Sequence, residues 1–108
     1  MASFEQCNAP DLAERLKRQP GLVLIDVREP WEYELARIEG TRLIPLGELT
    51  RRWEELDPEA ETVLICHHGY RSMQAAMFLA SRDFERLVNL RGGIEAWSVQ
   101  VDPSVPRY

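Results

Sequence analysis

The residues best suited to covalent chemistry lie in one short segment, Cys66-His67-His68-Gly69-Tyr70-Arg71-Ser72. The segment follows a continuous apolar run, residues 62–65, which is typical of a parallel strand covered on both faces. It precedes residues 72–82, whose apolar rows on most sides predict a buried helix. The backbone amides of the segment are then free donors at a helix N-terminus, where the helix dipole adds positive potential. A Cys66 thiol placed there is expected to ionise more readily than a free thiol, and the thiolate is the nucleophilic form.

Arg71 adds a full positive charge to the same segment. Together with the amides it predicts a cradle for an anion, which could be a thiolate, a persulfide, thiosulfate or phosphate. The alternative is that Cys66 is a buried apolar residue at the end of a strand, because cysteine is often buried. The glycine, arginine and serine that follow it within six positions favour the functional interpretation.

His67 and His68 could tune the charge of Cys66, contact a substrate, or face solvent as ordinary loop residues. Direct proton transfer by either is the weaker hypothesis, because neighbouring side chains rarely face each other. A zinc site is not predicted, since three consecutive residues do not converge easily on one tetrahedral ion and the sequence has no second ligand pair.

Predicted strands and predicted helices alternate along the chain on both sides of this segment. Such alternation predicts an α/β fold around a parallel sheet, in which ligands lie outside the carboxyl ends of the strands. Cys66 follows the most strand-like run directly. The tail, residues 101–108, is expected to be irregular. Strands are expected at residues 22–25, 43–44, 62–65 and 87–90, and helices at 9–16, 31–35, 46–56, 72–82 and 94–97.

Composition limits the classes of function. The 108 residues make one domain, residues 1–108, and the net charge of −5 argues against nucleic-acid binding, which needs a basic field. No apolar run is long enough to cross a membrane, and the N-terminus has no basic cluster followed by an apolar segment. We therefore expect a cytoplasmic monomer with reduced cysteines, although a chain cut from a longer precursor would look the same.

Three segments resemble the rhodanese family. Cys66–Ser72 is similar to its active-site loop, Leu24–Glu29 to its first strand and Asp-x-Arg turn, and Arg91–Trp97 to its C-terminal Gly-Gly-x-x-x-Trp signature. They span residues 22–98 in the family's order. The resemblance implies a single rhodanese-like domain with a central, mostly parallel five-stranded sheet flanked by helices on both faces.

The resemblance also implies an activity. Cys66 would take a sulfane sulfur from a donor such as thiosulfate and pass it, as a persulfide, to cyanide or a thiol. Two such half-reactions predict ping-pong kinetics. Arg71 would bind the anionic donor, and no metal or organic cofactor is implied. The remaining loop residues would line the substrate site: His67, His68, Gly69, Tyr70 and Ser72.

Other positions are given structural roles. Asp26 and Arg28 are expected to fix the turn after their strand by an ion pair rather than to act as acid and base. Trp31, Trp53 and Trp97 are expected to be packing residues. In the stretch that resembles the family's His-Ile-x-Gly-Ala, Arg37 replaces histidine and Thr41 replaces alanine, which alters the local hydrogen bonding.

Three rival functions stay open. Four residues separate Cys66 from Arg71, one fewer than in the dual-specificity phosphatases of similar fold, which disfavours a phosphatase or arsenate reductase. Non-catalytic interaction modules of this fold generally lose the cysteine. A persulfide carrier for a protein acceptor is not distinguished from a small-molecule enzyme. Cys7 is expected to be inert, with a resolving role as the alternative.

Overall fold

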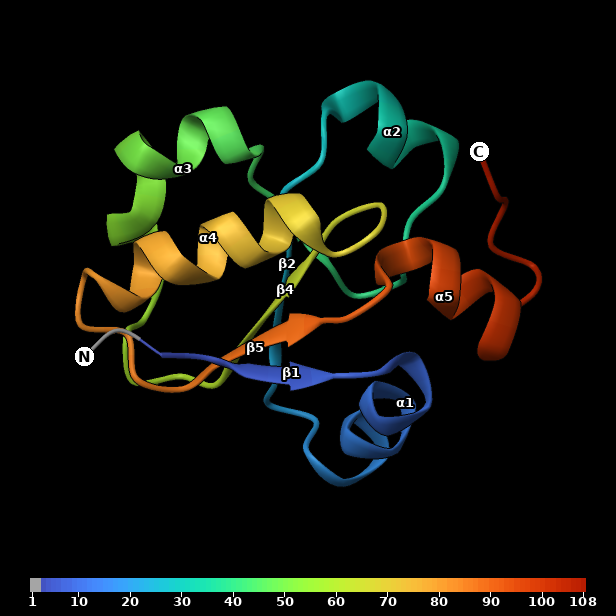
Figure 1. Ribbon diagram of the computed structural model, residues 1–108, viewed down its shortest axis with the longest axis horizontal. Helices are drawn as coiled ribbons and strands as arrows, with labels where there is room; N and C mark the ends of the chain where they lie inside the picture. The colour runs from blue at the N-terminus through green and yellow to red at the C-terminus, as the bar shows by residue number, and fades with distance from the viewer. Residues whose placement is uncertain (1–2) are drawn as a thin grey trace.

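Five parallel strands form a central sheet in the computed structural model, which describes residues 3–108 (Figure 1). Their order in the sheet is β1-β5-β4-β2-β3, and each neighbouring pair is parallel. The predicted fold class is therefore confirmed. The strands are β1 (Glu5–Cys7), β2 (Val23–Asp26), β3 (Arg42–Leu43), β4 (Thr62–Ile65) and β5 (Leu87–Leu90).

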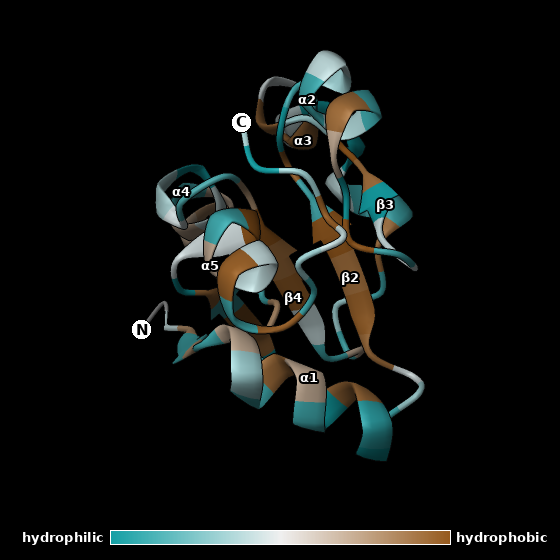
Figure 2. Cartoon of the chain, turned by 90° about the vertical axis from the view of Figure 1, so that its right-hand side faces the viewer, coloured by the Kyte–Doolittle hydropathy of each residue, from teal (hydrophilic) through white to brown (hydrophobic). Residues whose placement is uncertain are grey.

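Helices cover both faces of the sheet. They are α1 (Ala9–Arg18), α2 (Pro30–Leu35), α3 (Leu46–Arg52), a 3-10 turn η1 (Trp53–Glu55), α4 (Tyr70–Ala80) and α5 (Gly93–Gln100). Successive side chains of a strand point to opposite faces, so each strand contributes to two cores. One core lies under α1 and α5, and the other lies under α3 and α4. Figure 2 shows the apolar residues of β2 and β4 between these layers.

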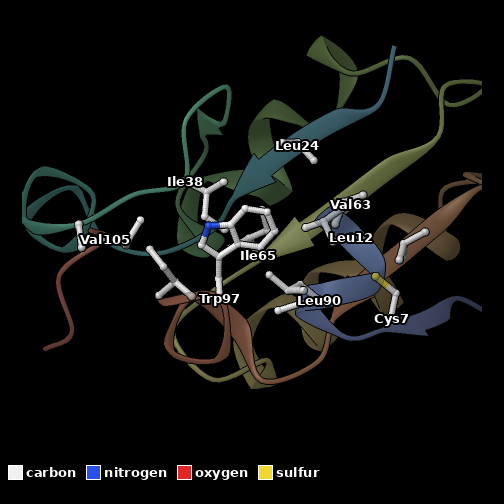
Figure 3. Close-up of a cluster of buried hydrophobic side chains, with 13 residues drawn as sticks. Cys7, Leu12, Leu24, Ile38, Val63, Ile65, Leu90, Trp97 and Val105 are labelled. Atoms are coloured by element: carbon white, nitrogen blue, oxygen red, sulfur yellow. The ribbon is translucent and has the colours of Figure 1, made fainter. Parts of the chain in front are cut away.

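The first core is built around Trp97, which is 7% exposed and points toward the sheet (Figure 3). Val63 and Ile65 of β4 belong to this core, whereas Leu64 between them belongs to the other. Trp31 differs from the prediction, because it is 61% exposed, with its ring in a T-shaped arrangement 6.0 Å from the Tyr108 ring. It is therefore not a core residue.

The sequence did not predict β1. Its residues, Glu-Gln-Cys, are mostly polar, and the strand lies at the edge of the sheet, paired only with β5. Its hydrogen bonds depend on a partner more than eighty residues away in sequence, which no local pattern reveals. The longer elements agree with their expected positions to within a few residues.

Residues 37–41, in which Arg37 and Thr41 replace histidine and alanine, form local hydrogen bonds. The Thr41 hydroxyl donates to the Ile38 carbonyl at 2.8 Å, and the Tyr33 hydroxyl donates to the Thr41 carbonyl at 2.7 Å. The Arg37 guanidinium lies 5.0 Å from the centre of the Tyr33 ring. The replaced residues are thus accommodated locally. Within residues 3–108, no helix is long and apolar enough to cross a membrane.

Candidate active site

Cys66 is the first residue after β4 and is 1% exposed. Its Sγ accepts a hydrogen bond from the Gly69 amide at 3.0 Å, and among the described loop amides Gly69 alone makes this bond. Several loop amides were expected to surround the sulfur, and in this structure one of the described amides donates to it. Gly69 has φ +101, and a Cβ there would lie 3.2 Å from the Gly92 nitrogen. Glycine is thus needed both for the turn and for the close approach to the neighbouring loop.

A buried polar chain runs from the sulfur into the sheet. The Cys66 Sγ lies 3.3 Å from Ser72 Oγ, and the Ser72 hydroxyl donates to Asn89 Oδ1 in β5. The Asn89 amide nitrogen donates to Gln6 Oε1 at 2.8 Å and to the Gly69 carbonyl at 3.2 Å. Because the amide nitrogen has these two acceptors, Oδ1 is left to face Ser72. Asn89 therefore holds both the hydroxyl and the glycine that touch the sulfur.

The N-terminus of α5 supports the loop from the other side. The Ile94 amide donates to the Cys66 carbonyl at 2.9 Å, and the Glu95 amide donates to the His67 carbonyl at 3.1 Å. Gly93 lies so close that a Cβ would be 2.3 Å from the His67 carbonyl oxygen. The Gly-Gly signature thus allows a helix N-terminus to bind the two carbonyls that begin the active-site loop.

Arg71 is paired with Glu32 of α2. Its Nη1 and Nη2 donate to the two carboxylate oxygens of Glu32 at 2.7 and 2.9 Å. The Glu29 amide donates to the same carboxylate at 3.0 Å, and the Tyr108 hydroxyl donates to it at 2.6 Å. The Arg71 hydrogen bond is the main reason that the pKa of Glu32 falls to about 2, and the same bond raises the pKa of Arg71. The guanidinium is therefore already bound to an anion within the protein.

Asp26 and Arg28 form an ion pair at the end of β2, and both side chains are fully buried. Arg28 Nε and Nη2 donate to the Asp26 carboxylate at 2.7 to 3.0 Å. The remaining guanidinium hydrogens reach the carbonyls of Glu32 and Ala36 and the Tyr108 hydroxyl. This geometry fixes the turn between β2 and α2, and thereby the position of α2, to which Glu32 belongs.

His67 is stacked between two rings. Its ring centre is 4.0 Å from that of His68 and 4.0 Å from that of Tyr108. Burial is the main reason that the pKa of His67 is lowered, and the neighbouring His68 lowers it further. Its buried Nε2 has no hydrogen-bond partner among the described residues. His67 is thus expected to be neutral at pH 7.

The predicted loop residues differ in exposure. Gly69 and Ser72 are buried, His67 is half-buried, and His68 and Tyr70 are exposed. An open pocket of about 370 Å³ lies beside the loop. It is lined by Gln6, His68, Gly69, Tyr70, Met73, Asn89, Arg91 and Gly92.

Three residues of the site were missed by the sequence analysis. Glu32 carries a signal in retrospect, because it is three residues after Glu29 and completes a capping box at the start of α2. Asn89 is a polar residue within an otherwise apolar strand, which indicates a buried hydrogen-bonding role. Tyr108 lies in the tail that was expected to be irregular, and nothing in the sequence indicates its contacts.

Cys7 lies apart from this site. It belongs to the core under α1 and α5, whereas Cys66 belongs to the core on the opposite face of the sheet. Both cysteines are free. Burial raises the pKa of Cys7, which makes it a poor nucleophile. Among the described residues, no group of three or more metal-ligating side chains is assembled.

The chain is similar to proteins of one family. A family model described as "Rhodanese-like domain" matches residues 8–100. The chain is 44% identical over 90 residues to Rhodanese-like/PpiC domain-containing protein 12, chloroplastic, of Arabidopsis thaliana, covering 79% of this chain and 30% of that protein. It is 34% identical to the putative sulfur carrier protein YrkF of Bacillus subtilis, covering 90% of this chain and 52% of that protein. The chain therefore spans about a third of the first relative's length and about half of the second's.

Another relative has nearly the same extent. The thiosulfate sulfurtransferase GlpE of Pseudomonas fluorescens is 34% identical, with 90% of this chain and 87% of that protein covered. Among solved structures, a rhodanese-related protein from Thermoplasma volcanium superposes with a TM-score of 0.84 at 33% identity. That match covers 97% of this chain and all of the other.

Proposed function

Because this chain belongs to the rhodanese-like domain family, we propose that it is a sulfurtransferase in which Cys66 carries the transferred sulfur as a persulfide. The observation that carries the proposal is the hydrogen bond from the Gly69 amide to Cys66 Sγ at the N-terminus of α4. An amide donor and a helix dipole both favour negative charge on sulfur, whether thiolate or persulfide. The similarity to a thiosulfate sulfurtransferase of nearly the same extent supports the same activity.

The reaction divides into two half-reactions. In the first, the Cys66 thiolate attacks the outer sulfur of a donor such as thiosulfate. The sulfur–sulfur bond of the donor breaks, its electron pair leaves with sulfite, and a new sulfur–sulfur bond forms on Cys66. In the second, cyanide or a thiolate attacks the outer sulfur and the Cys66 thiolate is regenerated. Because the first product leaves before the acceptor reacts, the kinetics are ping-pong.

A second candidate is a persulfide carrier that serves a protein acceptor. The similarity to a putative sulfur carrier protein favours it, although this chain spans only 52% of that relative. The two candidates share the Cys66 persulfide and differ in the acceptor. A carrier would be loaded readily but would turn over slowly with cyanide or small thiols, whereas an enzyme would turn over with both.

Intact-mass spectrometry tests the common step. After incubation with thiosulfate, the wild-type protein is expected to gain the mass of one sulfur atom and to lose it when cyanide is added. Cys66→Ser is expected to gain nothing. Cys7→Ser is the matched control, because Cys7 is also a buried free thiol, and it is expected to load as the wild type does. A sulfur adduct retained in Cys66→Ser would refute the proposal.

A further inference from the structure

The Glu32 carboxylate binds both Nη atoms of Arg71, beside the loop that carries Cys66. We call this pair of Nη donors the guanidinium fork, and we call it closed when Glu32 occupies it. We propose that Glu32 is a specificity residue, which withholds Arg71 from a doubly charged donor and thereby favours the persulfide of a small organic thiol over thiosulfate. This inference rests on the proposed sulfur-transfer function and names the donor class of the same site.

The geometry shows how firmly the fork is closed. Both Nη atoms of Arg71 bind Glu32, so two of the five N–H donors of the guanidinium are occupied. The Glu32 side chain is only 4% exposed, whereas that of Arg71 is 36% exposed. A backbone amide and the Tyr108 hydroxyl also hold the carboxylate. An incoming sulfonate would have to compete for these two donors with an acceptor that is already fixed on both oxygens.

The local balance of charge points the same way. The Arg71–Glu32 pair and the Arg28–Asp26 pair each have no net charge. His67, whose pKa burial lowers, adds none at neutral pH. No uncompensated charge from these groups is left to favour a doubly charged donor, so attraction for a donor over the loop comes from backbone dipoles and from Arg91 beside the loop.

The open pocket beside the loop offers a place for the organic part of such a donor. Tyr70 and Met73 give it apolar surface, and the exposed Arg91 is also part of its lining. No ion pair to Arg91 is present within residues 3–108, so its charge can attract a carboxylate on the thiol. Thiosulfate has no apolar part that would contact Tyr70 and Met73.

The loading step balances without any further reactant. The Cys66 thiolate attacks the outer sulfur of the donor persulfide, RS–SH, and the RS–S bond breaks. Its electron pair leaves with the thiolate RS⁻, and the outer sulfur keeps its proton as the Cys66 persulfide forms. One sulfur–sulfur bond replaces another, so no oxidant or reductant is needed.

The test compares Glu32→Gln with Glu34→Gln, a variant that loses the same charge from an exposed position of the same helix. The KM and kcat of each are measured with thiosulfate and with glutathione persulfide as donors.

In the wild type, kcat/KM is expected to be higher for the persulfide. Glu32→Gln is expected to lower the thiosulfate KM about fivefold to tenfold, as for one charge-assisted hydrogen bond regained at a partly exposed site. It is expected to change the persulfide KM by less than about twofold, the free-energy equivalent of a weak surface contact. Glu34→Gln should change neither.

A double-mutant cycle establishes whether Glu32 acts through Arg71. In an Arg71→Met background, Glu32→Gln should no longer change the thiosulfate KM, because the two effects are not additive when one residue acts through the other. If Glu32→Gln does not fold, Glu32→Asp replaces it, since the shorter side chain keeps the charge but cannot close the fork. Glu32→Asp should then lower the thiosulfate KM by a smaller factor.

Two results would overturn the inference, and they are distinct. A folded Glu32→Gln variant whose thiosulfate KM rises, or stays at the wild-type value, would show that Glu32 does not withhold Arg71 from the donor. A wild-type protein that loads Cys66 from neither donor would instead refute the proposed function, and this inference with it.

Discussion

Cys66 and Cys7 are both buried, and their immediate neighbours make them chemically different. The Cys7 sulfur faces a carbonyl, that of Asn8 at 3.4 Å, which disfavours a negative sulfur. The Cys66 sulfur lies 3.3 Å from Ser72 Oγ and also accepts a hydrogen bond from the Gly69 amide at 3.0 Å. Among the described residues, this backbone donor at the start of a helix is what distinguishes the surroundings of the Cys66 sulfur from those of the Cys7 sulfur.

Arg71→Lys tests how much of the donor is recognised by the guanidinium. A lysine at this position would bind Glu32 through its single ammonium group and would have no planar fork left for a sulfonate. We expect the thiosulfate KM of the wild type to rise only about twofold, because Glu32 already takes two of the guanidinium donors. In a Glu32→Gln background, in which these donors are released, Arg71→Lys should raise the thiosulfate KM about tenfold, with a smaller fall in kcat.

The second half-reaction provides the control for this variant. When a preloaded Cys66 persulfide is mixed rapidly with cyanide, no sulfonate is bound, so Arg71→Lys should react nearly as fast as the wild type. An equal slowing of both half-reactions would mean that Arg71 stabilises the persulfide rather than recognising the donor.

The sequence predicted the parts of the site that are contiguous in the chain. Cys66 and its loop, and the Asp26–Arg28 turn, each lie within one short segment that can be recognised locally. Glu32 and Asn89 reach the site from other elements, so their contacts depend on how α2 and β5 pack around β4. Such contacts follow from tertiary structure, and local spacing does not reveal them.

Among the elements, α5 contributes to the site without supplying a side chain to the sulfur. Its first-turn amides bind the carbonyls of Cys66 and His67, so the loop is held between the N-termini of two helices. Gly93 makes this approach possible, because it has φ +60 and lies in contact with the loop backbone. The loop conformation therefore depends on a residue that is distant in sequence and takes no part in the chemistry.

Gly93→Ala is expected to lower the free energy of unfolding by about 2–4 kcal/mol, from the left-handed backbone and the overpacking together. Gly47→Ala is the matched control, because Gly47 lies in α3 with no atom within 4 Å of the added Cβ. It is expected to raise the stability by about 0.5–1 kcal/mol. Urea unfolding of both variants gives the comparison, and a Gly93→Ala protein as stable as the wild type would exclude the close contact.

Length and burial explain which elements were predicted. The apolar runs of β2 and β4 are continuous, and that of β5 is interrupted only by Asn89, because these strands are covered on both faces. The edge strand β1 has three residues, too few for a periodic pattern to develop. The edge strand β3, of two residues, was expected one residue later, at 43–44. The single turn of η1 continues α3 directly, so the sequence presented the two as one helix.

At the scale of the whole molecule, one polar network joins the tail to the loop. Tyr108 accepts a hydrogen bond from Arg28 and donates one to Glu32, and Glu32 in turn binds Arg71. Val105 of the same tail is buried in the core under α5. The segment that the sequence presented as irregular therefore connects the end of β2, the start of α2 and the active-site loop.

This network predicts how the stability of the protein depends on pH. The pKa of Glu32 is held at about 2, below its ordinary value of 4.5, chiefly by the hydrogen bond from Arg71. Between these values the unfolded chain binds a proton that the folded protein does not, so stability falls as the pH falls. The contribution of Glu32 is fully present above about pH 5, and it is lost progressively as the pH falls toward about 2.

The difference between a pKa of 4.5 and one of about 2 corresponds to about 3 kcal/mol, which we reduce to about 2 kcal/mol because Arg71 is partly exposed to solvent. Urea unfolding at pH 6 and at pH 3 measures the loss for the wild type, for Glu32→Gln and for the exposed Glu34→Gln. Glu32→Gln has no carboxylate to protonate at this position, so it should lose less stability than the wild type between the two pH values, by about 1 kcal/mol, because pH 3 is still above the folded-state pKa of Glu32. Glu34→Gln should lose as much as the wild type, because its side chain makes no hydrogen bond within residues 3–108. Equal losses in wild type and Glu32→Gln would mean that the Glu32 carboxylate gains nothing from Arg71 on folding, and the closed fork would then not exist in solution.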